Sequence, residues 1–288
     1  MKWRGRRKSS NIEDRRRSGG RSGGMVLGGA GGLGVLAIVV IGWIFGIDLT
    51  PLLRDVAVQQ GGSGGGGGEV TAADEERAEF VAVTLADTEE VWARLFDGEV
   101  GRPYDPATLV LFKGVTQSPC GGASGATGPF YCPGDEKIYL DTDFFVTLDR
   151  RLGAGGDFAA AYVVAHEVAH HVQDELGILA DATGIRARVG EVESNAISVR
   201  IELQADCLSG VWAQAAQEQF GSLQKGDVAE AMAAAAAIGD DRLQTGAGRA
   251  PRPDSFTHGT SEQRQRWFAT GYDSGGIRDC DTFSAERL

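Results

Sequence analysis

The segment from His166 to His170, in which Glu167 follows the first histidine, leaves the chain little freedom in its local fold. On an α-helix, residues four apart lie on one face, so both imidazoles can reach a single metal ion. Glu167 lies one step around the helix, where it can take a proton from a water molecule at that metal. An ordinary core helix with two solvent-facing histidines is the alternative, but the strict pattern and the apolar flanks favour a zinc site.

A third ligand has to come from elsewhere, because a catalytic zinc usually has three protein ligands and leaves its fourth position to water. Beyond residue 171 the only histidine is His258, far along the chain, so we expect a carboxylate. Glu202 and Asp206 are four apart in a long helical stretch and therefore share a face. We predict that Glu202 binds the metal and that Asp206 accepts the free ring N–H of His166. An exposed acidic pair is the alternative, but the neighbouring residues are mostly apolar, and buried carboxylates need a partner.

These two motifs together resemble the gluzincin metallopeptidases. Further segments resemble one family, the bacterial putative neutral zinc metallopeptidases with a single N-terminal membrane anchor. The resemblance is carried by residues 2–7, 9–11, 13–16, 165–173, 202–207 and 257–264, and it covers nearly the whole chain, as far as the tail at 280–283. It implies a zinc-dependent peptidase that acts on a protein or peptide substrate.

The N-terminal part of the chain has the pattern of a membrane anchor. Residues 1–24 hold nine Lys or Arg against two acids, and residues 25–47 carry no charge. At about 1.5 Å per residue, a helix of that length crosses a hydrocarbon core of about 30 Å. The basic flank favours a cytoplasmic head, so the rest of the chain would lie outside the bacterial cytoplasmic (inner) membrane. A cleaved signal peptide is the alternative, but its apolar region would be shorter, roughly 7–15 residues.

Composition limits how the rest of the chain, residues 48–288, can be organised. Residues 48–69 form a linker with a run of glycines, which is typical of a flexible tether. Residues 70–288 are long enough for one domain, which we expect to be the zinc metallopeptidase. The chain after residue 24 keeps 19 of the 28 basic residues but 38 of the 40 acidic residues. Such an acidic domain is repelled by nucleic acid, so no nucleic-acid partner is expected.

Four cysteines agree with an oxidising compartment. Cys120 and Cys132 bracket a glycine-rich loop that a disulfide can close. Cys207 and Cys280 are then left to pair, which would tie the chain end to the helix that carries Glu202. Other pairings stay open, because connectivity does not follow from sequence alone.

The apolar patterns predict an order of elements. Helices are expected at 74–96, 158–176, 192–220, 227–243 and 261–270, and short strands at 109–112 and 137–140. This order favours an α+β, zincin-like domain with a small β-sheet and an active-site helix, preceded by one transmembrane helix. The strand at 137–140 is a candidate for the edge along which a substrate pairs.

His258 is the candidate outside the metal set. It precedes a predicted helix start at which Thr260 and Gln263 form a capping box. The positive end of that helix disfavours protonation, and a neutral His258 could donate a hydrogen bond to the oxyanion of the reaction. The segment resembles a Thr-His-Pro-Pro motif of prenyl-protein proteases, with Gly259 and Thr260 in place of the prolines. A surface loop histidine is the alternative, and His171 is expected to have a structural hydrogen bond.

The predicted function is that of a membrane-anchored zinc metalloendopeptidase, with Glu167 as the base and His258 as the oxyanion donor. A catalytically inactive, membrane-tethered zinc-binding scaffold is one alternative. It is disfavoured because structural zinc usually has four protein ligands. The other is an exported zinc amidase that hydrolyses a non-peptide amide.

Overall fold

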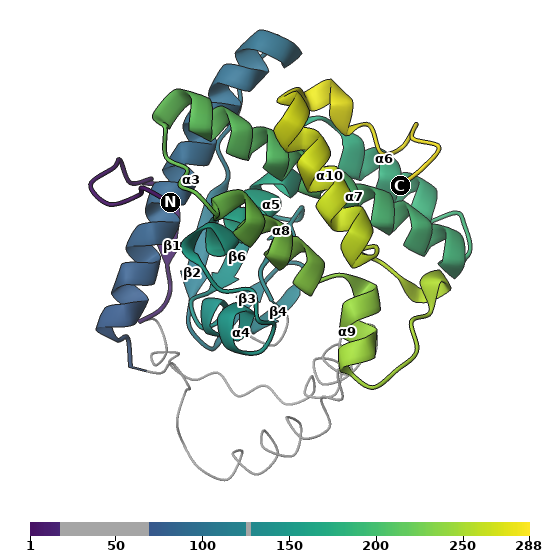
Figure 1. Ribbon diagram of the computed structural model, residues 1–288, viewed down its shortest axis with the longest axis horizontal. Coiled ribbons are helices and arrows are strands. Elements are labelled where there is room, and N and C mark those ends of the chain that lie inside the picture. Colours follow the sequence, from purple (N-terminus) through teal and green to yellow (C-terminus); the bar gives the residue numbers. More distant parts are fainter. Residues whose placement is uncertain (18–68, 125–127) are drawn as a thin grey trace, which may run out of the picture.

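The computed structural model describes residues 1–17, 69–124 and 128–288 (Figure 1). The predicted membrane helix at 25–47 and nearly all of the linker lie outside these residues. Among the helices in the described ranges, none has both the length and the apolarity that a membrane crossing demands. The described part is a mixed α+β domain, mostly helical, with two small sheets.

The elements follow one another in a simple order. The strands are β1 (Ile12–Asp14), β2 (Thr108–Phe112), β3 (Val115–Ser118), β4 (Gly121–Ser124), β5 (Phe130–Cys132) and β6 (Lys137–Asp141). The helices are α3 (Ala72–Leu95), α4 (Phe144–Arg150), α5 (Asp157–Glu175), α6 (Ile178–Arg186), α7 (Glu191–Phe220), α8 (Asp227–Ala237), α9 (Asp240–Gly246) and α10 (Ser261–Ser274). Short turns of other helix types are η1 (Phe96–Val100), η2 (Pro253–Ser255) and η3 (Ile277–Cys280).

The larger sheet has the order β1-β2-β6-β5, in which β1, β2 and β6 are parallel and β5 is antiparallel at one edge. Alternate residues of β2 belong to different cores. Leu109 and Leu111 pack with the helices, whereas Val110 and Phe112 pack on the other face with Ala123 of the β3–β4 hairpin. Both strands expected from sequence are therefore present. However, β6 is internal, so the prediction that 137–140 forms an edge strand is wrong; β5 takes that place.

The helices that carry the metal motifs form much as the sequence predicts. Helix α5 is buried along most of its length and is followed by Gly177, whose φ of 78° ends it in the left-handed region. Helix α7 runs unbroken from Glu191 to Phe220. The predicted helix at 227–243 is instead two helices, α8 and α9. The chain turns at Gly239, where a Cβ atom would lie only 2.4 Å from the backbone nitrogen of Ser261.

Helices α7 and α10 cross at backbone contact. A Cβ atom at Gly271 would lie 1.8 Å from the carbonyl oxygen of Cys207, and one at Gly210 would lie 2.1 Å from that of Phe268. Real Cβ atoms do not come this close, so only glycine allows the approach. The crossing brings the start of α10, with Arg264, against the motif of α7.

We expect Gly271→Ala to lower the free energy of unfolding by about 3 kcal/mol, because the helices must separate to admit the methyl group. Gly184→Ala is the matched control, since a Cβ atom in that helical position meets nothing within 4 Å. It should raise stability by roughly 0.5–1 kcal/mol. Thermal unfolding of both variants measures the difference, and equal stabilities would contradict the packing.

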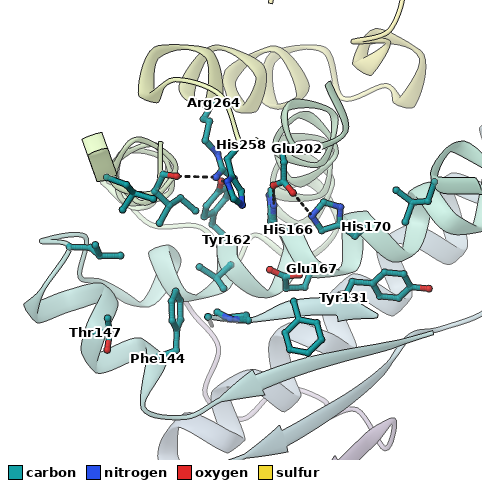
Figure 2. A pocket seen from close by; sticks show the side chains of 18 of the residues that line it. Tyr131, Phe144, Thr147, Tyr162, His166, Glu167, His170, Glu202, His258 and Arg264 are labelled. Atoms are coloured by element: carbon teal, nitrogen blue, oxygen red, sulfur yellow. Dashed lines mark hydrogen bonds and ion pairs between the residues drawn. The ribbon is translucent and has the colours of Figure 1, made fainter. Parts of the chain in front are cut away.

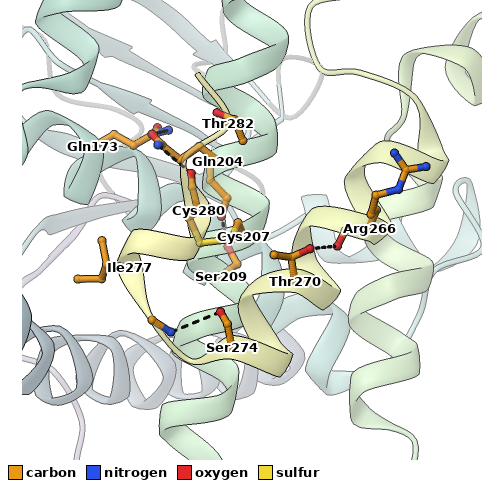
Figure 3. Close-up of a disulfide and its surroundings, with 12 residues drawn as sticks. Gln173, Gln204, Cys207, Ser209, Arg266, Thr270, Ser274, Ile277, Cys280 and Thr282 are labelled. Atoms are coloured by element: carbon orange, nitrogen blue, oxygen red, sulfur yellow. Dashed lines mark hydrogen bonds between the residues drawn. A yellow bond between two sulfur atoms is a disulfide. The ribbon is translucent and has the colours of Figure 1, made fainter. Parts of the chain in front are cut away.

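Two disulfides join the pairs that the loop spacing favoured, Cys120–Cys132 and Cys207–Cys280. The second ties η3 to the middle of α7 (Figure 3). Next to it, the side chain of Gln204 donates to the carbonyl oxygen of Cys280 over 3.0 Å. The chain end is thereby held against the helix that carries Glu202.

The N-terminal segment is part of the domain. Residues 1–24 were predicted to form a cytoplasmic head. In the structure, residues 1–17 lie along α3 and add strand β1 to the sheet (Figure 1). Met1 and Trp3 are buried, and the Trp3 ring packs edge-on against Phe80 with centroids 5.5 Å apart. Residues 1–17 are therefore packed into the described domain. Most of the basic residues in this segment pair with acidic side chains that lie far away in sequence.

Candidate metal centre

Three of the predicted residues converge on one point (Figure 2). Helix α5 presents His166 and His170, and α7 presents Glu202 from the facing side. The Nε2 atom of His166 lies 3.1 Å from Oε2 of Glu202, and Nε2 of His170 lies 3.6 Å from its Oε1. One ligand atom from each residue can be chosen so that all lie within 4.8 Å of one another. A single metal ion can thus be held by all three side chains.

The donor set suits zinc. Two imidazole nitrogens and one carboxylate oxygen are the ligands of many catalytic zinc sites. Burial would raise the pKa of Glu202, but nearby His170 and His258 and the hydrogen bond from His166 hold it well below its usual range. Burial also opposes protonation of His166, yet Asp206 and Glu202 raise its pKa to about 9. The site is therefore a buried, electron-rich cluster that stabilises positive charge.

Asp206 lies on the side of His166 that faces away from Glu202. Its Oδ1 atom is 3.0 Å from Nδ1 of His166, the ring nitrogen that does not face Glu202. Arg264 donates to both oxygens of Asp206, over 2.8 Å from Nε and 2.9 Å from Nη2. The Tyr162 hydroxyl donates to the same carboxylate. Although burial works against ionisation, Arg264 and His166 keep the pKa of Asp206 below its usual range.

Tyr162 and Arg264 were not predicted to belong to the metal site. Arg264 is only 1% exposed, and buried arginines occur where a carboxylate neutralises them. Its link to Asp206 spans 58 positions of sequence. The contact between Arg264 and Asp206 follows from the crossing of α7 and α10, which the sequence alone does not reveal.

His170 has its own supporting residue, Gln173, which the sequence analysis did not identify. The Nδ1 atom of His170 lies 2.8 Å from Oε1 of Gln173, which leaves Nε2 turned toward Glu202. The amide nitrogen of Gln173 donates to the carbonyl oxygen of Ile201 and to the side chain of Gln204. Gln204 also donates a hydrogen bond to the carbonyl oxygen of Cys280, so a series of hydrogen bonds connects His170 to the second disulfide.

We expect Gln173→Leu to weaken zinc binding by roughly 10–100-fold, because His170 loses the acceptor that fixes its tautomer and orientation. The variant should still fold, since leucine fills most of the buried volume. Gln219→Leu, an exposed change on α7, is the control. Competition with a chromophoric chelator measures the affinity. Equal affinity in both variants would show that Gln173 does not support His170.

Glu167 projects from α5 into the same space, below the three ligands in Figure 2. Its residue surface is 7% exposed, and burial raises the pKa of its carboxyl, while His170 and His166 oppose that rise. A carboxylate with a raised pKa is a better proton acceptor near neutral pH. Glu167 thus lines the cavity beside the ligands with a raised pKa.

His258 lies in the loop before α10 and lines the same cavity. The predicted capping box is confirmed, since Thr260 and Gln263 exchange side-chain and backbone hydrogen bonds. The direction of its pKa shift differs from the one expected. Burial lowers the pKa of His258, but Glu202 and Asp240 outweigh it, and the pKa lies above the usual value. Asp240 also holds the loop by accepting the backbone N–H groups of Thr257, His258 and Gly259.

His171 is a structural residue, as expected. Its Nε2 atom donates to the carbonyl oxygen of Asp105 over 2.7 Å, and Nδ1 lies 3.3 Å from the Tyr131 hydroxyl. Neither contact involves a metal ligand.

A second acidic group does not need a metal. Asp157, Asp227 and Glu230 come within reach of one another at the start of α5. The amino nitrogen of Met1 lies 2.8 Å from Asp157 and 3.1 Å from Asp227, and Glu230 accepts the backbone N–H of Phe158. The Met1 ammonium group thus pairs with two of these carboxylates, and a backbone N–H is bound to the third.

The cavity over the metal ligands has a volume of about 440 Å³ and is open to solvent on one side. Edge strand β5 forms one wall through Phe130 and Tyr131. Apolar side chains form much of the rest, including Phe144, Val163 and Ile238. The arrangement is an open cleft beside the metal ligands, with edge strand β5 in one wall.

Comparison with known proteins agrees with this geometry. The model of a family described as putative neutral zinc metallopeptidase matches residues 1–283. The uncharacterized protein YpfJ of Escherichia coli is 45% identical over 291 residues, which cover 98% of this chain and 99% of that protein. The uncharacterized protein Mb2605 of Mycobacterium bovis is 45% identical over 218 residues, 72% of this chain and 71% of that protein. No solved structure gives a significant match.

Proposed function

The chain belongs to the putative neutral zinc metallopeptidase family, and on that premise we propose that it is a zinc-dependent endopeptidase. The observation that carries the proposal is the buried convergence of His166, His170 and Glu202 at the floor of an open cleft. Zinc is the cofactor that this donor set and the family name both suggest. A structural zinc would have four protein ligands and no free cleft above it.

A zinc ion held by these three residues would act as a Lewis acid toward water and the peptide carbonyl. Glu167 takes a proton from the attacking water and passes it to the leaving amine. Asp206 and Gln173 hold the two histidine rings in the orientation that leaves each Nε2 atom toward the metal. Arg264 keeps Asp206 ionised in an interior where a lone carboxylate would bind a proton.

His258 is proposed as the donor to the oxyanion that forms on the carbonyl oxygen. A protonated imidazole donates more strongly than a neutral one, so the raised pKa supports the role in a different way from the one first expected. Asp240 fixes the position of the ring, because its Oδ1 atom lies 3.3 Å from Nδ1 of His258. The substrate would pair with β5 and place an apolar side chain in the cleft.

The proposed location is outside the cytoplasm. Two disulfides in a domain of this size are typical of an oxidising compartment. Attachment to the membrane would come from residues 25–47, for which the support is the charge-free sequence alone.

Digestion tests the proposal directly. The full-length protein, loaded with zinc, should cleave unfolded protein or a mixed peptide library, lose this activity with a chelator and regain it with added zinc. Cell-wall fragments offered in parallel test the amidase alternative. Release of fragments from wall material but not from peptides would replace the peptidase by the amidase. No hydrolysis of either substrate by a zinc-loaded protein would favour the scaffold.

A further inference from the structure

The basic residues of the N-terminal segment have partners on the domain. Seven of the Lys and Arg side chains in residues 1–17 lie within ion-pair distance of a carboxylate. Six of them pair with acids of α3, namely Glu75, Glu76, Glu79, Asp87, Glu89 and Glu90. The segment therefore forms a charge-matched strap along one helix (Figure 1).

The strap is also buried and hydrogen-bonded, so it is more than a surface charge contact. Arg16 is 5% exposed, and its guanidinium donates to the backbone carbonyl of Asp74 and to the side chains of Asp14 and Glu75. Strand β1 pairs in parallel with β2, with Ile12 opposite Leu109. Between these points, the backbone N–H of Ser9 donates to the carbonyl oxygen of Ala82 over 2.8 Å.

The described residues on either side of positions 18–68 lie close together. Arg17 pairs with Glu75 over 2.5 Å, and Glu75 lies in the first turn of α3, a few residues after position 69. Residue 17 and the first turn of α3 therefore lie side by side.

A single membrane crossing by residues 25–47 would put residues 1–17 and the domain on opposite sides. Strand pairing and buried ion pairs cannot form across a bilayer, so the crossing and the strap exclude each other within one chain. We propose that residues 1–17 lie on the same side of the membrane as the domain and are folded into it. The basic residues serve to hold α3 and are not a signal that keeps the N-terminus in the cytoplasm.

Labelling of two introduced cysteines tests the topology in the full-length chain. Ser10→Cys reports on the strap and Gln219→Cys on the domain, and both positions are exposed and outside the cleft. The native cysteines are disulfide-bonded and stay silent. A membrane-impermeant maleimide is added to spheroplasts before and after permeabilisation. We expect both sites to be labelled to the same extent in each condition. Labelling of position 219 in intact spheroplasts, with position 10 labelled only after permeabilisation, would overturn the proposal.

Thermal unfolding of the purified full-length protein then tests whether the strap is folded into the domain. Arg16→Ala removes a buried charge partner and should lower the midpoint by roughly 5–10 °C. Arg4→Ala is the matched control, because its pair with Glu76 is 73% and 58% exposed, and the midpoint should barely change. Equal midpoints for the two variants would show that the segment is not packed as described, and the proposal would fail even if both cysteines were labelled alike.

Discussion

Glu167→Gln is expected to lower kcat/KM for peptide hydrolysis by roughly 10²–10⁴-fold while the protein keeps its zinc. Glutamine has nearly the same volume and can still form hydrogen bonds, but it cannot accept the proton of the attacking water. Glu167 is not among the three converging ligands, so the metal affinity should change little. Peptide cleavage and zinc content are measured on the same preparation.

The matched control is Glu175→Gln at the end of the same helix. Glu175 pairs with Arg102 over 2.8 Å at the surface and lies outside the residues that line the cleft. Its removal should leave turnover unchanged, because exposed ion pairs contribute little. Near-normal cleavage by Glu167→Gln would show that another group accepts the proton. Loss of zinc from that variant would show instead that Glu167 supports the metal.

Glu202→Ala is expected to weaken zinc binding by more than the roughly 10–100-fold cost of losing an outer hydrogen bond, because a direct ligand is removed. The change also deletes the carboxylate that lies 3.1 Å from His166 and 3.6 Å from His170. Two histidines on one helix would then remain as the only protein ligands of the described site. Equilibrium dialysis against buffered zinc measures the loss.

Glu218→Ala controls for the removal of an acid from the same helix. Glu218 is exposed and only accepts a hydrogen bond from Gln214, so the zinc affinity should not change. If Glu202→Ala bound zinc as tightly as Glu218→Ala, Glu202 would not belong to the ligand set. Asp206 is too closely paired with Arg264 to take its place without loss of that contact.

The residues of the metal site were predictable because each pair of them is defined by its spacing along a single helix. Two histidines four apart need only a helix to face one metal, and Glu202 and Asp206 again lie four apart on a second helix. The capping box of α10 and the glycine that ends α5 are likewise set by neighbouring residues. Periodicity therefore sufficed for the motifs and for the helices that carry them.

Contacts between distant parts of the chain decided the features that the sequence did not reveal. The break between α8 and α9 follows from the approach of Ser261 to Gly239, which no helix propensity encodes. The place of β6 inside the sheet depends on β5, a strand of three residues after a glycine-rich loop. The raised pKa of His258 depends on Asp240 and Glu202, whose charges outweigh the effect of burial.

The N-terminal segment shows how one composition fits two interpretations. A basic stretch before an apolar run has the pattern of a membrane signal. The same basic side chains can equally form ion pairs with an acidic helix. The partners on α3 lie 58 to 83 positions downstream, beyond the reach of any local rule. Only the tertiary structure distinguishes the two.

Zinc content of the full-length, disulfide-intact chain tests the metal site most directly. The full chain is needed because a fragment that starts at residue 70 would lack β1 and the buried Arg16. We expect one tightly held zinc per chain and much less in the Glu202→Ala variant. A folded chain that binds no zinc after incubation with the metal would contradict the site, and the proposed peptidase activity would be refuted with it.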